Sequence, residues 1–206
     1  MLGPLVKPRL RPGPAGVTLV ELLVVVALLV IIIAVTAPSF RQMIDKQRVV
    51  NLNAQVVTDM QFARSEAATR RTKIRVAFQN DATMTCYSIF TYSNDGLQCN
   101  CLLASPCNGL PAGYTEIKTV RIPKDGTKLR VYPDVAVNKN NASEFAFEPL
   151  AGGLYTIPLD FAWEPLDMFK IRTWAGTDLE VDIVIGQSGR PTLCAPASSK
   201  IKEAAC

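Results

Sequence analysis

The first candidate for a chemical role in this chain is a single carboxylate within an apolar run. Glu21 is the only ionisable residue among the twenty-one from Val17 to Ala37. As a helix rising about 1.5 Å per residue, this run would be about 31 Å long, which matches the apolar core of a bilayer. A carboxylate inside such a span costs roughly 2.5–3.5 kcal/mol on insertion scales. We therefore expect Glu21 to have a cationic partner.

The second set of reactive residues is the six cysteines. A structural zinc site usually shows two C-x-x-C pairs, and this pattern is absent, so we expect no metal. Six cysteines in a part of the chain expected to lie outside the cytoplasm favour disulfides, for which fifteen connectivities exist. The cysteines lie in a central cluster and at the end of the chain, at Cys86, Cys99, Cys101, Cys107, Cys194 and Cys206.

Two disulfide pairings are favoured by position. Cys194 and Cys206 would close a short loop at a terminus with few apolar residues, stabilising it by roughly 2–4 kcal/mol. Asn94-Asp95-Gly96 is a strong hairpin signal. If that turn has two residues, Cys86 and Cys107 come near diagonal positions across the hairpin, which makes them a second candidate pair.

Catalysis is not expected from this sequence. The chain has no histidine, and histidine is the commonest general base and metal ligand. The carboxylates Asp160, Glu164 and Asp167 lie close together in sequence, but we interpret them as surface charges in a loop. No pairing of a nucleophile with a base is identifiable. We therefore predict a non-enzymatic protein without a cofactor.

A long helix should position these residues. After the apolar run over 17–37, residues 38–72 have the amphipathic period of a second helical half. Glu66 precedes Arg70 by four residues, the favourable order for a helix ion pair. Apolar side chains recur at spacings of three and four, at Val49, Leu52, Val56, Met60, Ala63 and Ala67.

Residues 73–206 should form a β-rich head. Apolar side chains alternate at Ile74, Val76 and Phe78, and a helix followed by many antiparallel strands predicts an α+β fold. Further strands are expected around Phe145–Phe147 and Leu179–Ile185, and at Met84–Thr91, Glu116–Ile122, Lys128–Tyr132 and Met168–Trp174.

The amino terminus resembles the processing site of type IV prepilins and of type II secretion pseudopilins. Residues 1–16 carry three cations, four prolines and no acid, and the block from Gly16 to Leu23 reads G-V-T-L-V-E-L-L. The resemblance implies that a prepilin peptidase removes residues 1–16 by cutting after Gly16, and that Val17 is then N-methylated. Glu21 would pair with the terminal amine of a neighbouring subunit. The family usually has phenylalanine where Val17 stands.

A second resemblance narrows the family. Met60–Ala67 reads M-Q-F-A-R-S-E-A, and Phe147-Glu-Pro is followed by Gly152-Gly153; both are similar to segments of GspH/FimT-type pseudopilins and minor pilins. The resemblance implies a type IV pilin-like α+β fold, with a long N-terminal helix packed on an antiparallel head that carries disulfides. It implies a minor structural subunit of a secretion pseudopilus or type IV pilus, which contributes to tip initiation and secretion.

The same resemblance implies a location and a set of partners. The protein would cross the bacterial inner membrane once through residues 17–37, with its head in the periplasm. Its partners would be the prepilin peptidase, other pilins through the N-terminal helix and the inner-membrane assembly platform. Two alternatives stay open for the apolar run: a secretory signal cleaved after Val35-Thr36-Ala37, or a plain single-pass anchor.

The alternative function is DNA capture. Gly186–Cys194 resembles the C-terminal G-R-x-R loop of DNA-binding FimT-type minor pilins, with Gly189 and Arg190 in place and Thr192 where the second arginine would be. The formal net charge is +4, but three of the cations lie in residues 1–16, so the chain from Val17 onward is at only +1. Phosphate binding scales with the number of cations. An ordinary strand and loop closed by a disulfide is therefore the competing interpretation of this segment.

Overall fold

The computed structural model describes residues 16–91, 97–124, 129–134, 136–138, 142–156 and 164–206. It divides into two compact units, Met1–Gln42 and Met43–Cys206, which we describe separately. One helix, α1 (Leu19–Arg70), contributes residues to both units. The predicted hairpin turn at 94–96 and the carboxylate Asp160 lie outside the described residues.

The described part of the first unit is helical from Leu19 onward. Thr18 caps α1, because its hydroxyl oxygen accepts a hydrogen bond from the Glu21 backbone nitrogen at 3.2 Å. Threonine followed three residues later by glutamate is the capping-box pattern. The apolar side chains of this unit are exposed, from Leu19 at 77% to Ile33 at 62%. No helical stretch among the described residues is long and apolar enough to cross a membrane. The span predicted over 17–37 therefore stays a prediction.

The second unit buries one face of its part of α1. Val49, Val56, Met60, Ala63 and Ala67 have no exposed surface, which confirms the predicted apolar face. The predicted ion pair is also present, with 2.6 Å between Arg70 Nε and Glu66 Oε2. The helix ends at Arg70 because the next residue, Arg71, adopts a left-handed φ of 53°, a common way to terminate a helix.

A six-stranded antiparallel sheet forms one side of the head. Its strand order is β3-β2-β1-β5-β6-β7. The prediction of Met84–Thr91 matches β2 at both ends, whereas the short strands β6 and β7 were not predicted. The strand bounds are β1 Ile74–Asn80, β2 Met84–Thr91, β3 Thr115–Pro123, β5 Glu144–Phe147, β6 Leu154–Thr156 and β7 Glu164–Pro165.

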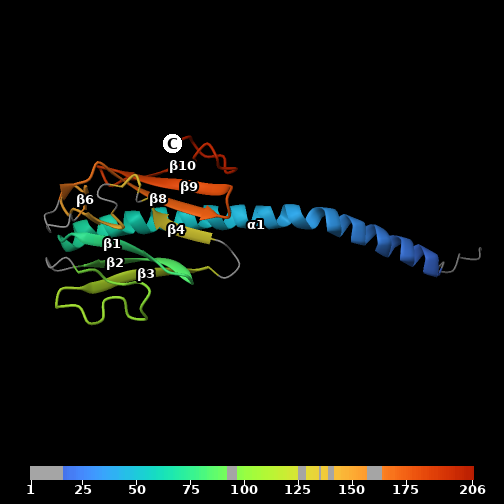
Figure 1. Cartoon of the computed structure of the whole chain (residues 1–206), viewed down its shortest axis with the longest axis horizontal. Helices are drawn as coiled ribbons and strands as arrows, with labels where there is room; N and C mark the ends of the chain where they lie inside the picture. Colours follow the sequence, from blue (N-terminus) through green and yellow to red (C-terminus); the bar gives the residue numbers. More distant parts are fainter. Residues whose placement is uncertain (1–15, 92–96, 125–128, 135, 139–141, 157–163) are drawn as a thin grey trace, which may run out of the picture. The chain divides into compact units, whose positions relative to one another are not determined.

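A four-stranded antiparallel sheet forms the other side, in the order β10-β9-β8-β4 (Figure 1). Strands β8 and β9 pair along their full lengths, from Met168 opposite Gly186 to Ala175 opposite Leu179. Of the alternating apolar residues predicted for β9, Val181, Ile183 and Ile185 are buried, and Leu179 is half-buried. The bounds are β4 Leu129–Pro133, β8 Met168–Ala175, β9 Leu179–Gly186 and β10 Pro191–Cys194.

The two sheets and α1 share one hydrophobic core. Met60 from the helix, Phe145 from the larger sheet and Phe169 from the smaller sheet belong to the same buried cluster. A buried polar contact also ties the helix to the larger sheet, because Asp59 accepts hydrogen bonds from the Tyr87 hydroxyl at 2.7 Å and from Lys118 Nζ at 2.6 Å. Burial and this carboxylate raise the pKa of Tyr87. The predicted α+β architecture is confirmed.

The cysteine loop, residues 97–114, corrects one predicted disulfide. Cys86 pairs with Cys101, and Cys99 pairs with Cys107; the predicted pair Cys86–Cys107 is wrong. That prediction assumed that the chain returns beside β2 directly after a two-residue turn. Instead β2 pairs with β3, where Arg121 lies opposite Cys86, and the intervening cysteine loop contains no strand.

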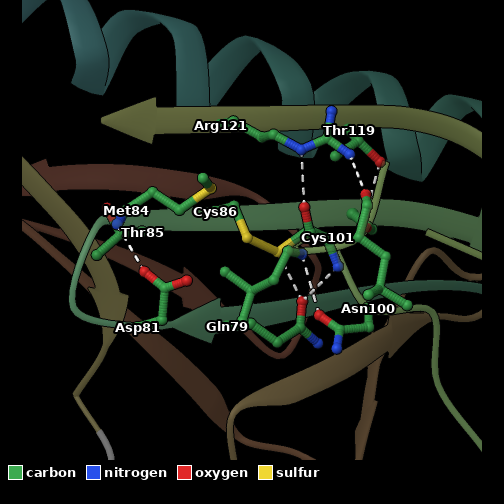
Figure 2. Close-up of a disulfide and its surroundings, with 12 residues drawn as sticks. Gln79, Asp81, Met84, Thr85, Cys86, Asn100, Cys101, Thr119 and Arg121 are labelled. Atoms are coloured by element: carbon green, nitrogen blue, oxygen red, sulfur yellow. Dashed lines mark hydrogen bonds between the residues drawn. A yellow bond between two sulfur atoms is a disulfide. The ribbon is translucent and has the colours of Figure 1, made fainter. Parts of the chain in front are cut away.

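Side chains of the larger sheet hold the cysteine loop through hydrogen bonds to its backbone (Figure 2). Gln79 on β1 accepts from the Cys101 backbone nitrogen at 3.0 Å and donates to the Cys99 carbonyl at 3.2 Å. Arg121 on β3 donates to the Cys101 carbonyl at 2.8 Å. The loop buries Ala77 and Phe90 beneath it, which explains why β1 is buried on both faces rather than one.

Candidate functional site

A groove in the second unit is lined by both polar and apolar residues. Its volume is about 540 Å³. Three segments that are far apart in sequence line it: the last turns of α1, the turn between β5 and β6, and the turn between β9 and β10. The lining residues are Gln61, Arg64, Ser65, Ala68, Pro149, Leu150, Ala151, Gly152, Gly189, Arg190 and Pro191.

Arg64 forms the floor of this groove. Its guanidinium Nε donates to the Gly152 carbonyl at 3.4 Å, and the side chain is half-buried. Gly152 has a φ of +66°, and a Cβ there would lie 2.4 Å from Arg64 Nε. The left-handed backbone therefore favours glycine at position 152, and a side chain there would displace the guanidinium group of Arg64.

The turn that contains Gly189 closely approaches both the Gly152 backbone and Arg64. Gly189 has a φ of +73°, and a Cβ there would lie 2.0 Å from the Gly152 carbonyl oxygen and 3.1 Å from Arg64 Nε. The Leu154 backbone nitrogen also donates to the Gln187 carbonyl at 3.3 Å, which joins the two turns. Close approach of two backbones thus fixes the wall of the groove beside Arg64.

The β5–β6 turn is held by its own carboxylate. Glu148 accepts hydrogen bonds from the backbone nitrogens of Leu150 at 3.0 Å and Ala151 at 2.6 Å. The Gly152 nitrogen donates to the Glu148 carbonyl at 3.0 Å. These bonds present the Leu150 side chain to solvent, where 92% of it is exposed. The groove therefore combines a fixed apolar rim with a cationic floor.

Arg190 adds a second cation to the groove from the β9–β10 turn, and its side chain is exposed. No carboxylate belongs to the lining residues in the described part of the chain. Two guanidinium groups can bind a carboxylate or a phosphate through paired hydrogen bonds. Arg190 is a residue that the sequence singles out, whereas Arg64 stands there only as one member of the Met60–Ala67 block. The signal that could have found Arg64 is the pair of glycines, although their contact with it is long-range.

A second polar cluster is satisfied within the protein. Asp182 on β9 is buried and accepts hydrogen bonds from Arg172 Nε at 2.8 Å and from Lys170 Nζ at 2.7 Å. Burial raises the pKa of Asp182, but the hydrogen bonds from these two cations outweigh it and hold that pKa below its usual range. The Cys194–Cys206 disulfide, the pairing that the sequence favoured, lies against this carboxylate. We assign this cluster a structural role.

The residues predicted to act in processing and assembly lie together at the start of the first unit. Gly16 and Val17 precede the helix and are exposed, and Glu21 is exposed in its first turn. A Cβ at Gly16 would meet no atom within 4 Å, so the fold itself does not require glycine there. An acidic residue in the first turn is also favourable beside the positive end of the helix dipole.

Two family profiles match the sequence in succession. A prokaryotic N-terminal methylation motif matches residues 11–37, and the type II transport protein GspH matches residues 53–162, which is more than half of the chain. The chain belongs to the GspH family. The GspH match includes Arg64 and Gly152, whereas the methylation motif includes Gly16, Val17 and Glu21. The GspH/FimT-type resemblance drawn from the sequence is confirmed.

One solved structure similar to this GspH-family chain is the type IV minor pilin FimU of Pseudomonas aeruginosa strain PAO1. The alignment covers 80% of this chain and 94% of FimU, at 18% sequence identity and a TM-score of 0.43. No curated protein gives a significant sequence match.

Proposed function

We propose that this chain is a minor pseudopilin or minor pilin, a structural subunit that is cleaved after Gly16, methylated at Val17 and built into a filament. The observation that carries the proposal is the succession of a methylation motif at residues 11–37 and a GspH domain at 53–162. The filament would be a type II secretion pseudopilus or a type IV pilus, in which this subunit contributes to tip initiation and protein secretion.

The first unit supports an assembly role. Its helix exposes a continuous series of leucine, valine and isoleucine side chains, each by about half or more. Burial of apolar area contributes roughly 25 cal/mol per Å², so covering this surface with neighbouring helices would stabilise a filament strongly. Glu21 would pair there with the terminal amine of an adjacent subunit, which offsets the cost of an isolated charge in an apolar setting.

Location and further partners belong to the same proposal. Before assembly, residues 17–37 would anchor the precursor in the inner membrane as a single pass, with the head in the periplasm. The prepilin peptidase would act on Gly16 and Val17, and the inner-membrane platform would deliver the mature chain to the filament. Three disulfides in the head, with no free cysteine among the described residues, support an oxidising compartment.

A filament-recovery experiment tests the assembly role. Cells that carry the assembly machinery would express the wild-type chain, Glu21→Gln or Glu66→Gln, and the filament fraction would be sheared and quantified. We expect Glu21→Gln to be processed but at least about tenfold depleted from filaments, because loss of one partner of an ion pair in an apolar setting is strongly unfavourable. Glu66→Gln is the matched control, since that carboxylate pairs with Arg70 within the helix. Equal recovery of the three chains would contradict the proposal.

The alternative function, DNA capture, has less support from the site. Thr192, at the position of the second arginine in the DNA-binding loop, lies in β10 and donates its hydroxyl to the Val184 carbonyl at 3.0 Å. Among the residues that the structure describes, two cations line the groove beside it, and each neutralised phosphate contributes separately to affinity. A gel-retardation assay at low salt, with Arg190→Ala as the test variant, distinguishes the two functions. Salt-sensitive retardation that is lost in Arg190→Ala would favour DNA capture.

A further inference from the structure

We propose that the groove between the two glycine turns binds an acidic peptide segment. Arg64 and Arg190 would hold a carboxylate side chain of this segment, and Leu150 would contact an apolar side chain next to that carboxylate. The inference goes beyond filament assembly, because it requires neither cleavage after Gly16 nor the apolar first half of α1.

The cationic part of the groove is pre-organised. Arg64 is half-buried, and its Nε is already bonded to the Gly152 carbonyl at 3.4 Å, which restrains the guanidinium group. A restrained arginine loses less conformational freedom on binding than a mobile one. Within the described residues, no ion pair involving Arg64 or Arg190 is found at 4 Å or less. The charges of Arg64 and Arg190 are therefore not neutralised by an ion pair with a described carboxylate of the protein itself.

The apolar part of the groove decides the kind of ligand. Leu150 is 92% exposed, although Glu148 fixes the turn that carries it through two backbone hydrogen bonds. Pro149, Ala68 and Pro191 line the same hollow. An inorganic anion would contact the arginines and leave this apolar surface exposed to water. A peptide that places an apolar side chain beside a carboxylate would use both.

Size and charge favour a peptide over a nucleic acid. The volume of about 540 Å³ lies within the usual range for a site that holds a small ligand or a few side chains. A nucleic acid gains affinity from many phosphate contacts, and two arginines supply few. Arg64 and Arg190 both line the groove, and a guanidinium group can bind one carboxylate through paired hydrogen bonds.

Fluorescence anisotropy with the full-length chain in detergent micelles tests the proposal. The probe is a labelled peptide, Gly-Ser-Leu-Glu-Leu-Ser-Gly, and its counterpart has Gln in place of Glu. We expect saturable binding of the first peptide and at least about tenfold weaker binding of the second, because one charge-assisted contact is lost. Arg190→Gln should weaken binding of the acidic peptide by a similar factor.

Matched variants separate the groove from general charge effects. Lys202→Gln removes the same charge from an exposed position outside the groove and should change affinity by less than about twofold. Leu150→Ser should weaken binding by about three- to tenfold through the lost apolar contact. Arg64→Lys keeps the charge but loses the planar guanidinium; it should also weaken binding, with thermal unfolding confirming that the head is intact.

Three results would overturn the proposal. The first is equal affinity for the Glu and Gln peptides, and the second is an unchanged affinity in Arg190→Gln. The third is an absence of peptide binding up to about 1 mM, whether or not a labelled DNA duplex binds with dependence on Arg190. None of these results bears on processing at Gly16, so failure here is distinguishable from failure of the proposed assembly role.

Discussion

One helix meets two different environments in this protein. In the second unit, Val49 and Met60 are fully buried within the head, whereas in the first unit Leu19 and Ile33 expose 77% and 62% of their surface. The residue types are similar, but only the residues of the second unit, such as Val49 and Met60, have polar neighbours at helical spacing. An amphipathic pattern thus indicates a helix that the same chain covers, and a uniformly apolar pattern indicates one that needs lipid or other chains.

The largest expected difference between the two regions is in core stability. Met60→Ala should lower the free energy of unfolding of the head by about 2–5 kcal/mol, because it leaves a cavity among α1 and both sheets. Val25→Ala, at a position that is 51% exposed, should change it by less than about 0.5 kcal/mol. Thermal unfolding of the full-length variants in detergent measures both. Comparable losses at the two positions would show that the first half of the helix packs on the head.

Loss of the C-terminal disulfide should lower the free energy of unfolding of the head almost as much as Met60→Ala does. It should leave the first unit unaffected. The double variant Cys194→Ser and Cys206→Ser opens a loop with a sequence separation of 12 and should cost about 3 kcal/mol in the chain-entropy account. It also removes the disulfide that lies against the buried Asp182. Chemical denaturation under oxidising conditions measures the loss, and recovery in filaments should fall no more than the folded fraction does. A filament defect in a fully folded variant would contradict this separation of roles.

Substitution of a glycine in the turns of the groove should have a smaller effect on the free energy of unfolding, and one that is specific to the backbone contact there. Gly189→Ala should destabilise the head by about 2 kcal/mol or more, because it combines a left-handed φ with a clash against backbone. Gly176→Ala is the matched control: it has a φ of +69° but no atom within 4 Å of the added Cβ, and should cost about 1 kcal/mol. Equal unfolding midpoints for the two variants would mean that the turns are further apart than described.

The smallest effect is expected at the surface ion pair of the second unit. Arg70→Gln removes the partner of Glu66 and should cost only about 0.3–0.5 kcal/mol, as for other exposed helix pairs. The same measurement with added salt should reduce the difference further. A loss above about 1.5 kcal/mol would mean that this pair is less exposed to solvent than its position on the helix indicates.

The sequence predicts the regular parts of this fold well. The apolar period over Val49–Ala67 identifies the buried helix face, and the two-residue period of β1, β5 and β9 identifies strands that contribute side chains to the core. These patterns are local, since each depends on residues within one element. The Cys194–Cys206 pairing was also accessible, because the two residues close a short terminal loop.

The irregular parts depend on contacts that no local pattern records. The cysteine loop covers the outer face of the larger sheet, so Cys86 meets Cys101 rather than Cys107. β6 and β7 have three and two residues, too few to show a period. The groove depends on Arg64 meeting a carbonyl 88 residues away, and the glycines that permit this contact look like ordinary turn residues in the sequence.

The most direct test of the central claim is the mass of the mature amino terminus. The chain would be isolated from cells that also express a prepilin peptidase, and its N-terminal peptide would be identified by mass spectrometry. The account predicts a chain that begins with methylated Val17, and Gly16→Ala should abolish that product while Gly13→Ala leaves it unchanged. A mature chain that begins at Pro38, or one that keeps residues 1–16, would contradict the account.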